Sequence, residues 1–346
     1  MSRVLAVRLD SDGDVLLTGP AVRALAASAG TVDLLVSPAG RAAAGLLPGV
    51  ADVLVFDAPW SGYVPPAVDE RAVRGLVVDL ALRGYDRAVV FTSDHQSPLP
   101  MALLLRLAGV PHVAATSADY PGSLLDVRHR RPVGLHEVAA ALDLARAAGA
   151  PLPATDPGLL AVRRPLPDVS GLLPAGPYVV VHPGASVPAR GMAAGHAHAV
   201  VAALVAAGRT VVVTGGPGEQ ALTAQVAADQ AVDLGGRTDL AGLAAVLDGA
   251  DAVVVGNTGP AHLAAAVGTP VVSLFSPVVP AERWRPYGVP TVLLGDQSAP
   301  CAGSRARTCP VPGHPCLSGI RPGAVVAAVT ELAGRAAAPA REAVGA

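Results

Sequence analysis

The sequence predicts an α/β fold made of two domains, each with a parallel, doubly wound sheet. In both halves, short apolar runs typical of buried strands alternate with segments of helical periodicity. Parallel strands need such crossovers, and helices then cover both faces of the sheet. Between the halves, residues 151–177 hold seven prolines and no sustained period. We therefore expect a domain at 1–150, a proline-rich linker at 151–177, a second domain at 178–335 and a tail at 336–346.

The expected elements follow the chain in order. In the first half we expect strands at 4–9, 32–36, 52–56, 87–91 and 112–115, and helices at 38–47, 70–82, 98–108 and 135–148. The acidic segment 10–14 is expected to be a turn into a helix that begins near Pro20. In the second half we expect strands at 178–181 and 210–214, a helix through 240–247, a strand-turn-helix-strand unit at 251–275 and a last helix at 321–335.

The composition is that of a globular protein. Hydrophobic residues make up 51%, charged residues 15% and the net charge is −2, which argues against a disordered or nucleic-acid-coating chain. Aromatic residues are only 3%, so a base-stacking surface is not expected. There is no apolar run of membrane-spanning length and no signal-peptide pattern. We expect a cytoplasmic monomer with at most peripheral contact at the inner face of the membrane.

The turn at 256–262 is the strongest candidate for a ligand site. It follows an apolar strand, so it lies at the carboxyl edge of the sheet, where open α/β folds bind ligands. Its glycines permit close backbone approach, and Pro260 suits a first helical turn whose free N–H groups can receive an anion. Capping alone is the alternative, and His262 by itself fits a buried core histidine equally well.

This turn carries a resemblance to a known family. Asn257-Thr258-Gly259-Pro260-Ala261-His262-Leu263-Ala264-Ala265-Ala266, followed by Gly268-Thr269-Pro270, resembles the donor-site signature of glycosyltransferase family 9, the ADP-heptose heptosyltransferases. The resemblance implies GT-B architecture, with two Rossmann-like domains facing a central cleft. It also implies that the C-terminal domain binds a nucleotide-sugar donor and the N-terminal domain binds the acceptor, with no cofactor and no metal.

Further motifs extend the donor site. His182-Pro183-Gly184-Ala185-Ser186 with Arg190 reads as a glycine-rich turn followed by a cation, which suits a diphosphate. The resemblance assigns donor binding to His182, Gly184, Ala185, Ser186, Arg190, Gly215, Gly216, Glu219, Thr238, Leu240, Asn257, Thr258, Gly259, Pro260 and His262. For Thr238 the alternative is a helix N-cap by it or by Asp239. The chain departs from the family at Met192-Ala193, where Trp-Pro is common, and at Asn257, where Asp is common.

The first turn of the chain supplies the candidate base. Ser11-x-Gly13-Asp14, followed by Pro20, resembles the family's first motif, in which the Asp after Gly is the proposed catalytic base. This maps onto Asp14 and not onto Asp10 or Asp12. An acidic N-cap cluster is the alternative.

Acceptor contacts are expected at Ser11, Gly13, Ser93, Asp94, Gln96, Arg128 and Arg130. The loop 92–97 follows a strand and should reach the same edge as Asp14, while the basic segment 126–131 could hold an anionic group. A solvated loop and a solvated charge run are the alternatives.

The three cysteines, Cys301, Cys309 and Cys316, lie in a proline-rich loop with His314. Their spacing lacks a C-x2-C pair, so it fits a structural zinc site poorly, and we expect reduced thiols and no metal.

The resulting hypothesis is an inverting, metal-independent glycosyltransferase. By resemblance it moves heptose from ADP-heptose to a hydroxyl of a glycan, glycolipid or natural product. Two alternatives remain open: a catalytically silent nucleotide-sugar or glycan-binding protein of the same architecture, and a nucleotide-sugar epimerase. Release of free nucleoside diphosphate in step with acceptor modification distinguishes transfer from epimerisation.

Overall fold

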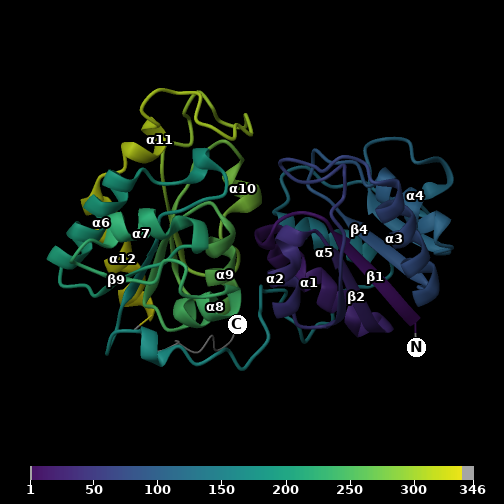
Figure 1. The fold of residues 1–346 in the computed structure, drawn as a ribbon, viewed down its shortest axis with the longest axis horizontal. Coiled ribbons are helices and arrows are strands. Elements are labelled where there is room, and N and C mark those ends of the chain that lie inside the picture. The colour runs from purple at the N-terminus through teal and green to yellow at the C-terminus, as the bar shows by residue number, and fades with distance from the viewer. Residues whose placement is uncertain (1, 337–346) are drawn as a thin grey trace, which may run out of the picture. The chain divides into compact units, whose positions relative to one another are not determined.

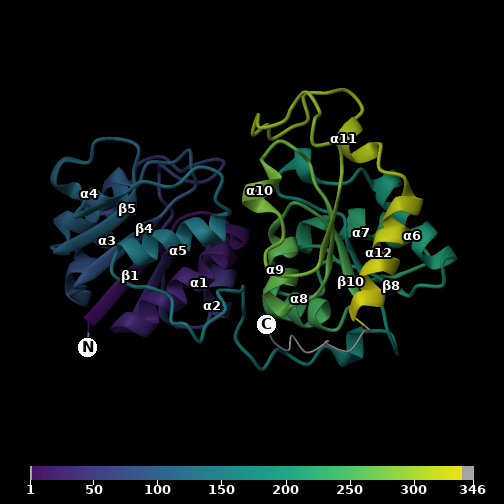
Figure 2. The same ribbon diagram turned by 180° about the vertical axis from the view of Figure 1, so that it is seen from behind.

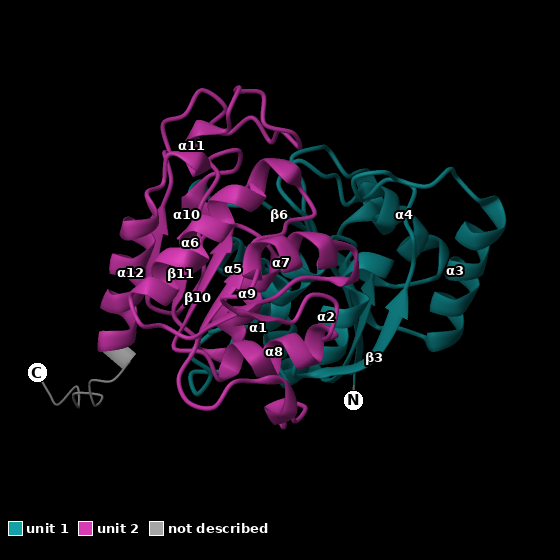
Figure 3. Ribbon diagram, turned by 60° about the vertical axis from the view of Figure 1, so that its left-hand side comes forward, with its two compact units in different colours: residues 1–163 teal, residues 164–346 magenta. Residues whose placement is uncertain are grey.

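The computed structural model describes residues 2–336 and divides into two compact units, 1–163 and 164–346 (Figure 3). The division falls inside the segment 151–177. Part of that segment belongs to unit 1, because Asp156 pairs with Arg23 (Nε to Oδ2, 2.7 Å) and Arg163 donates to the carbonyl oxygen of Leu47 (2.9 Å). The predicted tail beyond Ala336 lies outside the described residues.

Unit 1 is a six-stranded parallel sheet in the order β3-β2-β1-β4-β5-β6 (Figures 1 and 2). Its strands are β1 (Ser2–Arg8), β2 (Gly30–Val36), β3 (Val50–Val55), β4 (Arg87–Phe91), β5 (His112–Thr116) and β6 (Val127–His129). Its α-helices are α1 (Asp12–Ala29), α2 (Arg41–Leu46), α3 (Glu70–Arg83), α4 (Leu99–Leu107) and α5 (Glu137–Ala147). Leu5 and Val7 of β1 join a buried cluster with residues of α3 and α4, and α1 packs on α5.

Unit 2 is a second six-stranded parallel sheet, in the order β12-β11-β10-β7-β8-β9. Its strands are β7 (Val179–His182), β8 (Val211–Val213), β9 (Val232–Asp233), β10 (Ala252–Gly256), β11 (Val271–Leu274) and β12 (Thr291–Leu294). Its α-helices are α6 (Ala194–Ala206), α7 (Gln220–Ala227), α8 (Leu240–Asp248), α9 (Gly259–Val267), α10 (Ala281–Trp284), α11 (Pro315–Ser318) and α12 (Pro322–Ala336). One buried cluster joins α6, α7 and α12 to the sheet, and α8 packs on α9.

The two sheets have the same topology. Numbered within its own unit, each has the strand order 3-2-1-4-5-6, so the direction of winding reverses between β1 and β4 in unit 1 and between β7 and β10 in unit 2. Ligands of such folds bind beyond the carboxyl ends of the strands at this switch point. Two parallel sheets covered by helices confirm the predicted α/β fold of two Rossmann-like domains.

One local prediction was wrong, and one strand was not predicted. Helix α1 begins at Asp12, not near Pro20, because Ser11 is extended and its carbonyl oxygen accepts the Val15 N–H (3.0 Å). The helix runs through Pro20 because burial of its apolar residues outweighs the hydrogen bond that a proline removes. The basic segment 126–131 contains a strand, β6, whose pairing with β5 its charges concealed.

Candidate functional site

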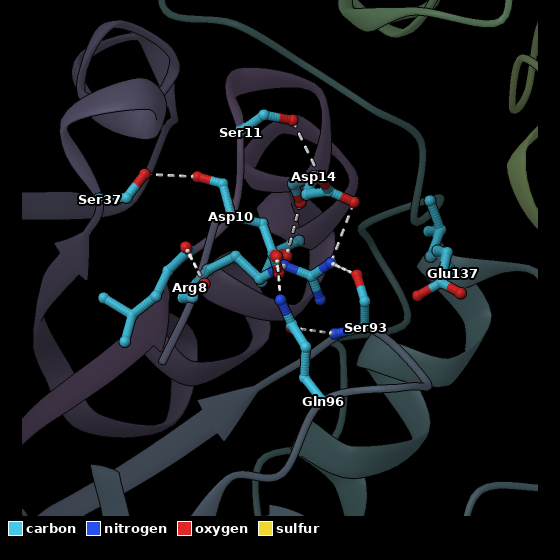
Figure 4. A network of polar contacts seen from close by, with 12 residues as sticks. Arg8, Asp10, Ser11, Asp14, Ser37, Ser93, Gln96 and Glu137 are labelled. Carbon is cyan, nitrogen blue, oxygen red and sulfur yellow. Dashed lines mark hydrogen bonds and ion pairs between the residues drawn. The ribbon is translucent and has the colours of Figure 1, made fainter. Parts of the chain in front are cut away.

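The edge of unit 1 is built around Arg8, the last residue of β1. The chain turns from β1 into α1 within three residues, so Asp10 and Asp14 both reach this side chain. Arg8 Nε lies 2.8 Å from Asp10 Oδ2, and Arg8 Nη2 lies 3.1 Å from Asp14 Oδ1 (Figure 4). The second oxygen of Asp14 accepts the hydroxyl of Ser11 at 3.0 Å. Asp14 is thus held by two donors on the first turn of a helix.

A loop that follows β4 completes this network from across the switch point. Arg8 Nη2 also donates to Ser93 Oγ at 3.0 Å, and Gln96 Nε2 donates to Asp10 Oδ1 at 2.7 Å. Gln96 Oε1 in turn accepts the backbone N–H of Ser93 at 3.0 Å. Arg8, Asp10, Gln96 and Ser93 therefore form a closed ring of polar contacts, which we call the Arg8 ring (Figure 4).

Burial sets the electrostatics of this edge. It raises the pKa of Asp10 to about 6, although the Arg8 guanidinium opposes the shift. Burial acts to lower the pKa of Arg8, but Asp10 and Asp14 outweigh it and the pKa is raised. Burial also raises the pKa of Asp12, against a hydrogen bond from the Ala43 N–H. Asp14 is the more accessible partner of Arg8, with 23% of its side chain exposed against 11% for Asp10.

A cavity of about 420 Å³ opens beside this ring, entirely within unit 1. Ser93, Asp94, Gln96 and Arg130, four of the predicted acceptor residues, line it. Its other charged and titratable lining residues are Arg8, His95, Asp119, His129, Arg131 and Glu137. The cavity is therefore polar on several sides and carries both signs of charge.

Three predicted acceptor residues do not line the cavity. Ser11 lies on the β1–α1 turn and Gly13 in the first turn of α1. Arg128 donates to the carbonyl oxygens of Ser117 (3.2 Å) and Ala118 (2.6 Å), which fixes the loop after β5. The sequence reasoning missed Arg8 and Glu137, of which Glu137 is buried and pairs with Arg131 (2.9 Å). An arginine inside the apolar strand 4–9 was the signal that could have pointed to Arg8.

In unit 2, the turns after β7 and β8 meet through one glutamate. Glu219 Oε2 accepts the backbone N–H of Gly216 at 2.8 Å and lies 3.9 Å from His182 Nε2. A Cβ atom at Gly184 would overlap the Glu219 carboxylate, so only glycine permits this approach. The opposite ring nitrogen of His182 contacts Thr214 Oγ1 at 3.0 Å. Burial lowers the pKa of His182, and Glu219 opposes this.

The turn between β10 and α9 is held by a side-chain amide. Asn257 Nδ2 donates to the carbonyl oxygen of Ser276 at 3.1 Å, and Asn257 Oδ1 accepts the Ser276 N–H at 3.0 Å. The aspartate that is common in the family at this position could not donate the first of these bonds. Thr258 is the N-cap of α9 but makes no capping bond with its side chain. In the first turn Pro260 has no N–H and the Ala261 N–H donates to the Thr258 carbonyl oxygen at 3.1 Å, which leaves the Gly259 N–H open to a ligand.

The segment that contains Arg190 packs against Gly256, the last residue of β10. A Cβ atom at Gly256 would overlap the carbonyl oxygen of Arg190, so the two backbones touch. Arg190 Nε is buried and has no hydrogen-bond partner among the described residues. An unsatisfied buried cation donor suits an anionic ligand.

The remaining predicted donor residues divide between the sheet edge and its surroundings. After β7, Ala185 is partly buried and Ser186 is exposed, and Gly215 follows β8. Pro260 lies in the first turn of α9, and His262 is a buried residue of the same helix. Thr238 and Leu240 flank Asp239, which caps α8 by accepting the Gly242 N–H at 2.7 Å. Met192, the other departure from the family, packs in the apolar core of unit 2.

The cysteine loop contains no recognisable metal centre. Cys301 and Cys316 are buried and Cys309 is partly buried, and burial raises the pKa of the Cys316 thiol. Within residues 2–336, no group of three or more His, Cys, Asp and Glu side chains is placed to hold a metal ion.

No helix in the same range is both long and apolar enough to cross a membrane.

Comparison with known proteins identifies the family. The sequence profile described as "Glycosyltransferase family 9 (heptosyltransferase)" matches residues 74–314. The chain belongs to glycosyltransferase family 9.

Solved structures agree at the level of the fold. The structure of Escherichia coli ADP-heptose lipopolysaccharide heptosyltransferase II aligns with 98% of this chain and 100% of its own, at 21% identity and a TM-score of 0.74. Escherichia coli heptosyltransferase WaaC with ADP aligns with 97% of this chain and 99% of its own, at 22% identity and a TM-score of 0.68. Together with the two sheets, these matches confirm the expected GT-B fold class of this family 9 protein.

One curated relative matches over a shorter stretch. Lipopolysaccharide heptosyltransferase 1 of Pseudomonas aeruginosa is 47% identical over 73 residues, which are 21% of this chain and 20% of that protein. This chain therefore matches only about a fifth of that relative's length.

Proposed function

We propose that this family 9 protein transfers heptose from ADP-heptose to a hydroxyl group of a glycan or glycolipid, with inversion at the anomeric carbon and without metal or cofactor. The family supports glycosyl transfer, and the related WaaC is described with ADP. The enzyme would act as a monomer in the cytoplasm, with at most peripheral contact at the membrane. Unit 1 would bind the acceptor and unit 2 the donor.

The observation that carries this proposal is the setting of Asp14. Its carboxylate lies at the switch point of unit 1, partly exposed, and is oriented by Arg8 and Ser11. Arg8 and Ser93 link it to the polar cavity, where an acceptor sugar could bind through Asp94, Gln96 and Arg130. A carboxylate joined through Arg8 to a sugar-sized polar cavity suits a general base.

In the proposed reaction, Asp14 takes the proton of the acceptor hydroxyl as its oxygen attacks the anomeric carbon. The bond from that carbon to the diphosphate breaks, and ADP leaves with the electron pair. Arg190 and the Gly259 N–H at the start of α9 would stabilise the charge that develops on the leaving diphosphate. His182, Glu219, Thr238 and Leu240 would contact the rest of the nucleotide.

The test is an Asp14→Asn variant assayed for ADP release from ADP-heptose with heptose-deficient lipopolysaccharide as acceptor. We expect turnover to fall about 10²- to 10⁴-fold while ADP binding is retained. Asp12→Asn is the matched control, because Asp12 lies on the same turn but accepts a bond from the Ala43 N–H.

Near-normal turnover in Asp14→Asn would refute the base assignment. Binding of ADP by the unaltered protein without transfer to any acceptor would favour the silent binding protein instead. Conversion of the donor sugar without release of ADP would favour an epimerase.

A further inference from the structure

The Arg8 ring and Asp14 together contain more buried charge than a general base requires. One guanidinium lies between two carboxylates, and only one of them, Asp14, is placed for the proposed proton transfer. Arg8 is 4% exposed and Asp10 is largely buried. Burying charged groups costs free energy, so we look for a structural or functional reason for the second carboxylate. The function of Asp10 is therefore a question that the proposed mechanism leaves open.

The geometry fixes the position of the guanidinium from three strands. Ser93 contacts it from the loop after β4, and Asp10 contacts it from the end of β1, where Gln96 of the same loop holds the Asp10 carboxylate. The Asp10 carbonyl oxygen accepts the hydroxyl of Ser37, which follows β2, at 2.7 Å. The ring is thus tied to the ends of three adjacent strands, and Arg8 Nη2 extends from it toward Asp14.

We propose that Arg8 and Asp10 are positioning residues for Asp14: the ring fixes the guanidinium that orients the base, and the Asp10 carboxylate shares its positive charge so that Asp14 remains an effective proton acceptor. This inference rests on the proposed role of Asp14. Neither Arg8 nor Asp10 is required to touch the substrates.

Charge sharing follows from the distances. Two carboxylates on one guanidinium compete for its field. Burial brings the pKa of Asp10 to about 6, with Asp14 and Glu137 adding to the rise, and Arg8 and Gln96 opposing it. Glu137 is itself paired with Arg131. When Asp10 takes up a proton, the charge of Arg8 acts on Asp14 alone, and the base is weakened.

The first test reads the coupling without an activity assay. Carbon-13 NMR of labelled aspartate carboxyls should show Asp10 titrating near pH 6 in the unaltered protein. Asp14→Asn should move this midpoint to lower pH by about half a unit or more, because the second carboxylate no longer repels the charge on Asp10. Asp12→Asn, the matched control, should leave it in place. An Asp10 midpoint that does not respond to Asp14→Asn would refute charge sharing.

The second test is the pH profile of ADP release. The unaltered enzyme should lose kcat as the pH falls through about 6, because protonated Asp10 no longer shares the charge of Arg8. Asp10→Asn should lower kcat at about pH 8 by about 3- to 10-fold and remove that limb of the profile. A role in folding alone would change the melting temperature and leave the limb where it was.

Arg8→Lys tests the positioning role separately. A lysine keeps the charge but cannot bridge three partners with a planar fork, so we expect kcat to fall about 10²-fold with little change in KM. If Arg8→Lys does not fold, Ser93→Ala removes one contact of the ring and should lower kcat by a smaller factor in the same sense. Full kcat in a folded Arg8→Lys would overturn the inference.

The two hypotheses fail differently. An active Asp14→Asn removes the proposed base, and the inference with it. An inactive Asp14→Asn together with an Asp10→Asn that has normal kcat and an unchanged pH profile leaves the base in place and removes only the positioning pair.

Discussion

The two units have one strand order but equip the same edge of the sheet with different chemistry. In unit 1, charged side chains converge at the switch point and hold one another through the Arg8 ring. In unit 2, glycines at 184 and 256 allow backbone and carboxylate to approach closely, and the groups proposed to hold the ligand are the backbone N–H at the start of α9 and one arginine. The difference suits the two tasks proposed here, because proton transfer needs a titratable side chain, whereas a diphosphate needs many fixed donors.

A large effect is expected where unit 2 depends on a missing side chain. Gly256→Ala should weaken ADP binding by more than about 10-fold and lower the free energy of unfolding by about 1–3 kcal/mol, because the new methyl group would displace the Arg190 backbone. Isothermal titration with ADP and thermal unfolding measure both. Gly195→Ala, near the start of α6, is the control, since its Cβ meets no atom within 4 Å. Unchanged ADP affinity in Gly256→Ala would break the comparison.

The charge that unit 2 does contain should matter next. Arg190→Gln should raise the dissociation constant of ADP about 10- to 100-fold, because a charge-assisted hydrogen bond contributes about 1.5–3 kcal/mol. Adenosine, which lacks the diphosphate, should bind both proteins alike. The exposed Arg321, changed to Gln, serves as the control. Equal loss of adenosine and ADP binding would show that Arg190 supports the fold and not the phosphates.

The units should respond to pH in opposite senses. The pKa of Asp10 rises from its ordinary 3.8 to about 6 on folding, so the stability it contributes is present below 3.8 and is lost as the pH rises through about 6. Asp10→Asn should therefore gain stability relative to the unaltered protein over this window, by at most about 3 kcal/mol. The pKa of His182 is lowered from 6.5, so its contribution is present above 6.5 and is lost as the pH falls.

Urea unfolding between pH 4 and pH 8 checks both slopes, with His182→Gln as the second variant. The direction of the pH dependence of stability in Asp10→Asn is the more decisive of the two results. A stability difference between Asp10→Asn and the unaltered protein that does not vary with pH would contradict the burial of an ionised carboxyl in the ring.

The smallest effect is expected at Ser11. Ser11→Ala removes one neutral donor from Asp14 Oδ2 and leaves the bond from Arg8, so kcat should fall only about 3- to 10-fold. Steady-state kinetics of ADP release measure it, with the exposed Ser123→Ala as the control. A loss as large as that of Asp14→Asn would assign Ser11 a more direct part in the reaction.

Local patterns predicted most of the fold. The strand at 87–91 has the predicted bounds, and the unit at 251–275 has the predicted order of strand, helix and strand. Strands of this kind are predicted from short apolar runs between turn residues, a pattern that depends only on neighbours in the sequence. The start of α1 was misplaced because a proline is a strong local signal, whereas the burial that outweighs it comes from the sheet.

The site was less accessible to the same reasoning. Asp14 was singled out by its motif, but the partners of the Arg8 ring come from residues as far apart as 8 and 96. Likewise, the departure at Asn257 could not be interpreted without Ser276, which is 19 residues further along the chain. Register between parallel strands decides such contacts, and the sequence of either strand alone does not specify its partner.

The uncapped start of α9 has a thermodynamic consequence. A helix whose first N–H groups lack a capping side chain frays more readily, and a bound phosphate would take the place of the cap. Part of the free energy of donor binding would then be spent on ordering one turn of the protein. Hydrogen exchange at the backbone amides of Gly259, Ala261 and His262 should slow on addition of ADP, so that the nucleotide acts as the last element of local secondary structure as well as a ligand.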